Sequence, residues 1–328
     1  MLRMICHRVL LFILALLGIS VVVFLALRVL PGDVAQVMAG LNAPQGKVEQ
    51  LRAEIGLNKP LYTQYFDWIC GILRGDFGAS MITGIPVSKV IASSAIVTFP
   101  LILLGLAIAL LIGVPLGCWQ VTHEGKLAQS LSRFSALIAG SIPALWGGLL
   151  LILLLGKGIG IFGILPTQDF PADGWSDFTE AFLSLLLPAL TVGIIVGSSF
   201  MRYTCAAVED ISRSEIASQA MACGMTRKQV VWRVGLRLAL PQLVSVIGLT
   251  FAHMVTGVMV IENLFSLPGL GMGMVRDVGL RDFVAVQGEL FMLAALFLTV
   301  GFIVDISHRL LDSRLAKDSY SNDEDGKA

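Results

Sequence analysis

Few polar side chains in this sequence stand in a pattern that could do chemistry. His253 lies in a long apolar segment beside Met254, with Met259 a little further on. Imidazole and thioether groups bind metal ions, so this set could line a nickel path, but a metal site needs several convergent ligands. A hydrogen-bonded structural histidine is the favoured interpretation, with a pore-lining role and metal ligation as alternatives. The sequence predicts no bound cofactor.

A serine protease acting within the membrane is a second possibility. Gly197-Ser198-Ser199-Phe200 is the nearest approach to a Gly-x-Ser-Gly nucleophile, and it lacks the final glycine. His253 could face this serine across a helix bundle, but no group that would stabilise an oxyanion can be identified. The protease therefore remains a distant alternative.

Nucleotide and nucleic-acid chemistry have little support. The sequence lacks the GxxxxGK[ST] loop that holds phosphates, so any ATP hydrolysis must belong to another chain. Gly158, Gly160 and Gly163 spell G-x-G-x-x-G, but no predicted strand precedes them, and a turn is the better interpretation. The formal net charge of zero gives no indication of a nucleic-acid partner. The five cysteines are scattered and predict neither a disulfide framework nor a metal site.

The elements that would position these residues are membrane-spanning helices. The chain is 56% hydrophobic and only 14% charged, which indicates a membrane protein. One helical crossing needs about 20 apolar residues. The sequence therefore predicts an all-α polytopic membrane protein with six transmembrane helices. These fall at about 9–30, 97–121, 134–155, 182–201, 242–262 and 289–308.

Lysine and arginine placement predicts the orientation. Most of these residues fall at the amino terminus, in the second and fourth connections, and after the last span. By the positive-inside rule, both termini face the cytoplasm. Glu289, at the outer end of the sixth span, is expected to reach water. Gly113-x-x-x-Gly117 and Gly193-x-x-x-Gly197 predict close helix packing in the second and fourth spans.

These spans suggest three regions. Residues 1–95 hold the first transmembrane helix and a long periplasmic loop, 96–312 a core of five transmembrane helices, and 313–328 a disordered cytoplasmic tail. Within the periplasmic loop, a turn is predicted at 31–33, and a helix from Val48 that stops at Gly56. An aromatic-rich stretch over 62–73 could lie along the membrane surface.

The inner loop at 202–241 is the most informative stretch. Ser212-Arg213-Ser214-Glu215 has the form of a capping box, which predicts a helix from about residue 213. Gly224 would end that helix in a left-handed turn. Thr226 to Gln229 forms a second capping box, beginning a helix that leads to Pro241. Small side chains on the first helix would let another surface approach its backbone.

This loop resembles the coupling motif of binding-protein-dependent ABC importer permeases. The family's pattern is Glu-Ala-Ala, three residues, then Gly; here it falls on Ser218, Gln219, Ala220 and Gly224, and one of the first three matches. Other stretches resemble the peptide/nickel branch of these permeases more closely. They are Leu30-Pro31-Gly32-Asp33, Gly56-Leu57-Asn58-Lys59-Pro60-Leu61 with Gln64-Tyr65, Gly75-Asp76-Phe77-Gly78-Ala79-Ser80, Ile261 to Gly271, and Arg281 to Gly288.

The resemblance implies a type I ABC importer permease fold with a cytoplasmic coupling helix, in the inner membrane. It implies a pore formed with a homologous second permease, two ABC ATPase subunits, and a periplasmic or lipid-anchored substrate-binding protein. The substrate would be a short peptide, with nickel or a metallophore complex as the alternative; a stand-alone channel is disfavoured. The coupling residues would be Ser218, Gln219, Ala220 and Gly224, with Glu215 and Ala217 as flanking contacts.

Overall fold

The computed structural model describes residues 2–29, 34–39, 43–54, 57–123, 130, 134, 138 and 140–311. These residues are helical almost throughout, and they form two compact units. The larger unit comprises the described parts of 99–267 and 300–311, and the smaller comprises those of 2–98 and 268–299. The predicted turn at 31–33 and the predicted disordered tail at 313–328 lie outside the described residues.

Five of the six predicted spans are confirmed as helices long and apolar enough to cross a membrane. They are α1 (Leu2–Val29), α5 (Val87–Thr122), α8 (Phe178–Ser212), the continuous helix that ends with α11 (Leu236–Leu264), and α13 (Phe283–Leu311). The window predicted at 134–155 differs. Its described helix, α7 (Ala144–Leu155), has 12 residues and is about 18 Å long. Much of the window before α7 lies outside the described residues.

The long helices correct part of the predicted inner loop. The 35 residues of α8 measure about 52 Å, against a bilayer core of about 30 Å, so α8 continues through residue 202 as far as Ser212. On the other side of the loop, α10 (Arg227–Gln229) passes through the π-helix η2 (Val230–Gly235) directly into α11. Pro241 is therefore inside a helix. Within 202–241, all of which is described, α9 (Glu215–Ala222) is the one helix that is not continuous with a long helix.

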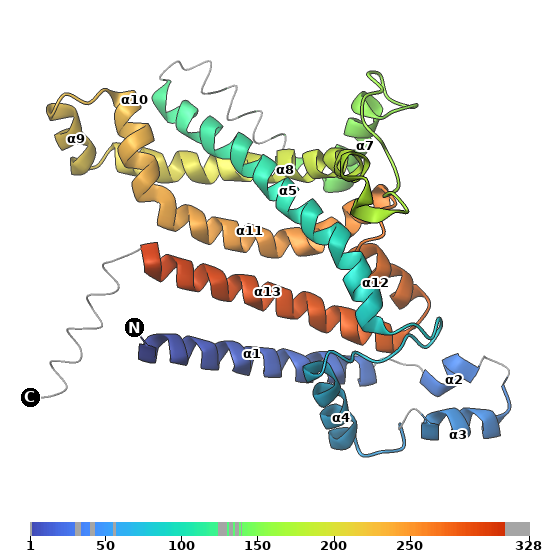
Figure 1. The fold of residues 1–328 in the computed structure, drawn as a ribbon. Helices are drawn as coiled ribbons and strands as arrows, with labels where there is room; N and C mark the ends of the chain where they lie inside the picture. The colour runs from blue at the N-terminus through green and yellow to red at the C-terminus, as the bar shows by residue number, and fades with distance from the viewer. Residues whose placement is uncertain are drawn as a thin grey trace, which may run out of the picture. The chain divides into compact units, whose positions relative to one another are not determined.

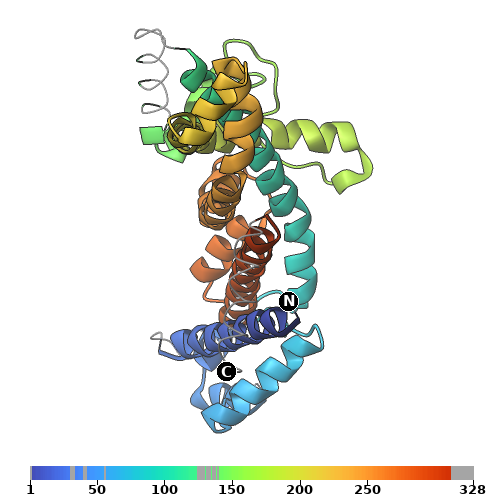
Figure 2. The same ribbon diagram turned by 90° about the vertical axis from the view of Figure 1, so that its left-hand side faces the viewer.

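In the larger unit, α8 lies beside α7 and α11 (Figure 1; Figure 2). Asp177 caps α8, because its Oδ1 accepts hydrogen bonds from the backbone N–H groups of Thr179 at 3.0 Å and Glu180 at 3.1 Å. The close packing predicted from the glycine pairs is confirmed. A Cβ on Gly113 would lie 2.6 Å from the backbone oxygen of Gly197, so only glycine lets α5 and α8 approach this closely.

Between α7 and α8 the chain forms turns. Gly158 and Gly163 have φ of +87° and +59°, which confirms the predicted turn there. A single 3₁₀ turn, η1 (Gly174–Ser176), precedes α8.

The smaller unit contains α1, α2 (Val34–Ala39), α3 (Gln45–Glu54), α4 (Leu61–Leu73) and α12 (Leu270–Gly279), with the first turns of α5 and α13. The helix predicted from Val48 is confirmed as α3, and the aromatic stretch is α4. Helix α4 packs against α1 (Figure 1), where the Tyr65 hydroxyl and Ser20 Oγ lie 2.8 Å apart and the Tyr65 and Phe24 rings meet edge to face at 5.5 Å. Helix α12 was not predicted.

Candidate functional sites: the coupling helix and a motif-lined cavity

Helix α9 begins two residues later than the predicted capping box requires. The Ser212 hydroxyl donates to the Glu209 carbonyl at 2.8 Å, so it belongs to the last turn of α8 and cannot cap α9. Ser214 is the N-cap residue instead, and its side chain makes no capping hydrogen bond. The predicted box at Ser212 is therefore wrong, because α8 continues through it.

The end of α9 agrees with the prediction. Gly224 has φ of +91°, the Gly224 N–H bonds to the Met221 carbonyl at 2.9 Å, and the Met225 N–H bonds to the Ala220 carbonyl at 3.2 Å. This pair of bonds is the Schellman motif, which requires a left-handed residue such as glycine. The second capping box is also confirmed, with Thr226 and Gln229 bonding reciprocally at 2.9 and 3.3 Å.

The residues predicted to couple to an ATPase divide between two faces of α9. Ala217 is fully buried, so it holds α9 against the chain rather than offering surface to a partner. Glu215, Ser218 and Gln219 are exposed. Sequence reasoning overlooked Ile216, which is 49% exposed. A large apolar side chain standing between Glu215 and Ala217 in a polar segment was the available signal.

A packed cluster lies at the base of this region. Its buried members come from the ends of α5 and α8 and from η2 and α11. Helix α9 contacts α8 and η2, two of the elements that contribute side chains to this cluster. The members are Cys118, Val121, Cys205, Ala207, Val208, Val231, Ala239 and Leu243.

Neither chemical alternative gains support from the described side chains. Ser198 is inside α8 and its hydroxyl donates to the Ile195 carbonyl at 2.6 Å, so it has the bonding of an ordinary helical serine rather than of a nucleophile. His253 is exposed on α11, whereas Met254 is buried, so these two side chains do not face the same site. Among the described residues, no group of three or more His, Cys, Asp and Glu side chains could hold a metal ion.

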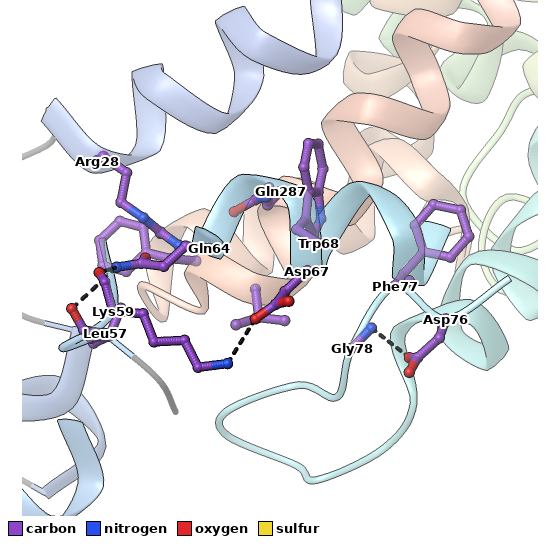
Figure 3. A pocket seen from close by; sticks show the side chains of 13 residues that line it. Arg28, Leu57, Lys59, Gln64, Asp67, Trp68, Asp76, Phe77, Gly78 and Gln287 are labelled. Carbon is purple, nitrogen blue, oxygen red and sulfur yellow. Dashed lines mark hydrogen bonds and ion pairs between the residues drawn. The ribbon is translucent and has the colours of Figure 1, made fainter. Parts of the chain in front are cut away.

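A second feature joins three of the sequence stretches that carry the family resemblance. The motif cavity, as we name it, has a volume of about 260 Å³ and lies within the smaller unit (Figure 3). The stretch at 56–65 contributes three lining residues, the stretch at 75–80 three more, and the stretch at 281–288 another three. These nine are Leu57, Lys59, Gln64, Asp76, Phe77, Gly78, Phe283, Val284 and Gln287.

Glycine explains why these stretches can converge. Gly78 has φ of +85°, and a Cβ there would lie 2.9 Å from Cγ1 of Val284. Gly71, which also lines the cavity, would place a Cβ 2.9 Å from the Asp76 carbonyl oxygen. A side chain at either position would push the 75–80 turn away from α4 or α13.

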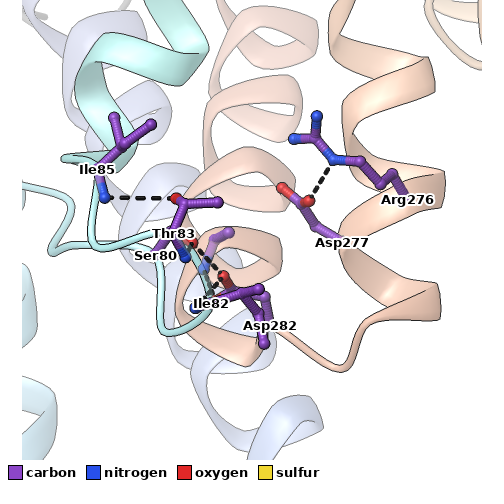
Figure 4. A network of polar contacts seen from close by, with 8 residues as sticks. Ser80, Ile82, Thr83, Ile85, Arg276, Asp277 and Asp282 are labelled. Carbon is purple, nitrogen blue, oxygen red and sulfur yellow. Dashed lines mark hydrogen bonds and ion pairs between the residues drawn. The ribbon is translucent and has the colours of Figure 1, made fainter. Parts of the chain in front are cut away.

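A buried polar contact ties the same turn to α13. Ser80 Oγ donates to Asp282 Oδ2 at 2.6 Å, while Asp282 Oδ1 accepts from the Ala285 N–H at 3.1 Å and caps α13 (Figure 4). Ser80 is 8% exposed and Asp282 only 1%. Asp282 therefore both holds the 75–80 turn and caps the start of α13.

We expect Asp282→Ala to lower the free energy of unfolding by about 2 kcal/mol or more, because it removes a helix cap and leaves the buried Ser80 hydroxyl without its acceptor. Thermal unfolding of the purified protein in detergent measures this. Asp67→Ala is the matched control, since the Asp67–Lys59 pair is exposed and is worth less than about 1 kcal/mol. Equal losses in the two variants would contradict the role of Asp282.

Glu289 departs from the prediction that it reaches water. Its side chain is 1% exposed, and its Oε2 is buried with no hydrogen-bond partner among the described residues. The unpredicted α12 covers it: a Cβ on Gly273 would lie 3.4 Å from Glu289 Oε1. Arg276 Nε donates to Asp277 at 2.9 Å, and this bond raises the pKa of the Arg276 guanidinium.

Comparison with known proteins agrees with these features. Residues 109–317 match the family described as binding-protein-dependent transport system inner membrane component, and residues 1–90 match the N-terminal family of the same systems. The chain is similar to the glutathione transport system permease protein GsiC of Salmonella typhimurium, at 32% identity over 312 residues, covering 95% of this chain and 98% of that protein. GsiC of Escherichia coli strain K12 is equally similar, with the same identity and coverage.

Solved structures share the fold. An inward-facing structure of the MetNI methionine ABC transporter superposes with a TM-score of 0.54 at 20% identity, covering 68% of this chain and 97% of the other. A second crystal form gives the same TM-score at 19% identity. These matches establish the type I ABC importer permease fold that the resemblance implied. The chain belongs to the inner-membrane permease family of binding-protein-dependent ABC importers.

Proposed function

We propose that this chain is the pore-forming permease subunit of an ATP-driven importer of short peptides, working by alternating access. The single observation that carries the peptide assignment is the 32% identity to GsiC over almost the whole of both chains. Glutathione, which that permease is named for, is itself a short peptide. Nickel or a metal chelate remains the alternative substrate, and no observation in the described residues favours it over a peptide.

The energy source would be two separate ATPase subunits that dock on α9. Three observations support this placement. Helix α9 stands apart from the long helices, it exposes Ser218, Gln219 and Ile216, and it is fixed at both ends by the buried Ala217 and the Gly224 turn. A homologous second permease would complete the pore, and a periplasmic or lipid-anchored binding protein would deliver the peptide. His253 is a candidate pore-lining residue.

The proposed topology follows the positive-inside rule, with both termini and α9 in the cytoplasm. The region 1–95 would then hold the first span and the periplasmic loop, 96–312 the permease core, and 313–328 a cytoplasmic tail. In this topology the motif cavity lies on the periplasmic side.

Reconstitution of the complete system in proteoliposomes tests the function. We expect the permease pair, ATPases and binding protein together to import a radiolabelled dipeptide or tripeptide only when ATP is supplied, and not to import nickel. A binding protein that retained a sugar or a single amino acid would refute the substrate assignment. Uphill peptide uptake by this chain without the ATPases would refute the assignment of ATP hydrolysis to separate subunits.

A further inference from the structure

The motif cavity has the charge pattern of a small-molecule site. A cation from the end of α1, Arg28, and a carboxylate from the 75–80 turn, Asp76, both line it. The aromatic side chains of Trp68 and Phe77 line it too. In Figure 3, Arg28 and Asp76 are labelled at opposite ends of the group, with Trp68 between them. Small-ligand sites commonly combine such apolar walls with a few placed polar groups.

Arg28 is held in place by an aromatic ring. Its guanidinium carbon lies 4.7 Å from the centre of the Phe24 ring, a cation–π contact that fixes the side chain. Its Nε is buried and has no hydrogen-bond partner among the described residues. A guanidinium in this state favours an anion with two acceptor oxygens, which is the shape of a carboxylate.

Asp76 is fixed in a different way. Its Oδ1 accepts a hydrogen bond from the Gly78 N–H at 2.9 Å, which orients the carboxylate within the turn. Its Oδ2 can accept from a ligand ammonium group. The other two charged lining residues neutralise one another, since Lys59 Nζ lies 2.7 Å from Asp67 Oδ2.

Two amide side chains complete the wall. Gln64 Nε2 donates to the carbonyls of Leu57 and Lys59 at 3.1 and 2.8 Å, so the orientation of this amide is set. Gln64 Oε1 is buried and has no partner among the residues that the structure describes. Gln287, also lining the cavity, is 6% exposed. Both N–H groups of Gln64 are already engaged, so the Gln287 amide is the one that can offer a peptide bond both a donor and an acceptor.

We propose that the motif cavity binds a short zwitterionic peptide, with its carboxylate at Arg28 and its ammonium group at Asp76. A volume of about 260 Å³ is below the range usual for drug-sized ligands, which limits the guest to two or three residues. The inference rests on the proposed peptide function and gives it a chemical basis: selection of molecules that carry both free ends.

Three forms of one dipeptide test the site: radiolabelled Ala-Phe, its carboxyl-terminal amide, and its N-acetyl form. Each is measured by equilibrium binding to the assembled permease–ATPase complex in lipid nanodiscs, without nucleotide or binding protein. We expect free Ala-Phe to bind at least about tenfold more tightly than either blocked form, because each block removes one charge-assisted contact.

Variants of Arg28 and Asp76 test recognition of the peptide's carboxylate and of its ammonium group separately. Arg28→Gln should weaken free Ala-Phe about tenfold and abolish discrimination against the amide, while discrimination against the N-acetyl form persists. Asp76→Asn should do the reverse, because asparagine can still accept from the Gly78 N–H. Arg74→Gln is the matched control: it removes an arginine of the same unit that does not line the cavity, and should leave all three affinities unchanged.

Two results would overturn the proposal: equal binding of all three forms by the parent complex, or equal loss of all three in Arg28→Gln. If Arg28→Gln accumulates poorly in membranes, Arg28→Lys replaces it, because lysine keeps the positive charge but cannot bind a carboxylate through two N–H groups. Unchanged selectivity in both Arg28→Lys and Asp76→Asn would also overturn the proposal. The proposed function is judged separately, by import in the complete system. Peptide import without cavity selectivity refutes this site alone, whereas a complete system that imports no peptide refutes the function.

Discussion

Ile216→Asp is expected to release the ATPase subunits from the membrane complex and to lower ATP-driven uptake by at least about tenfold. Ile216 is 49% exposed on α9, and Gln219 is exposed one turn further on. Truncating or charging a central apolar contact of a protein interface commonly costs about 2 kcal/mol or more, and aspartate adds the cost of desolvating a charge. Co-purification of the ATPases, with uptake measured in parallel, gives the result.

A matched variant separates docking from damage to the fold. Ile161 is 72% exposed in the turn after α7, in the same structural unit, and in the proposed topology that turn lies on the periplasmic side. Ile161→Asp should leave both ATPase association and uptake within about twofold of the parent, since surface substitutions change stability little. If Ile216→Asp retained the ATPases as well as Ile161→Asp does, α9 would not be the docking helix.

The coupling region shows what local patterns can and cannot predict. Gly224 and the box at Thr226 were predictable, because each is decided by residues within one turn of the chain. The start of α9 was not, because Ser212 could serve either α8 or α9 and only the length of α8 decides. The burial of Ala217 beside an exposed Ser218 was not predictable either, because it depends on how α9 packs against α8 and η2.

The motif cavity could not be predicted from local sequence patterns either. Its lining stretches at 56–65, 75–80 and 281–288 were all visible in the sequence, but only as separate resemblances. Their meeting depends on α4 packing against α1 through Tyr65, and on the Ser80–Asp282 bond, which joins residues 202 positions apart. Glu289 was misjudged because α12, the helix that covers it, was overlooked, although residues 270–279 carry a marked amphipathic pattern that could have predicted it.

Gly113→Ala is expected to destabilise the larger unit severely, because its new methyl group meets rigid atoms on α8. The Cβ would lie 2.6 Å from the Gly197 carbonyl oxygen, 2.6 Å from Phe200 Cβ and 3.0 Å from the Met201 backbone nitrogen. None of these atoms is the movable end of a flexible side chain, so α5 and α8 must separate. Overpacking of this kind costs about 1–3 kcal/mol or more, and thermal unfolding in detergent should show a fall of several degrees.

The same substitution on α13 provides the comparison. A Cβ on Gly301 meets nothing within 4 Å, and alanine is the better helix former by about 0.5–1 kcal/mol, so Gly301→Ala should be neutral or stabilising. Both changes add one methyl group to a glycine inside a long helix, so the difference between them isolates the α5–α8 contact. Equal thermal stability of the two variants would mean that this contact does not hold the helices together. Since the base cluster includes side chains from the ends of these same two helices, Gly113→Ala should also weaken ATP-driven uptake even where the protein still reaches the membrane.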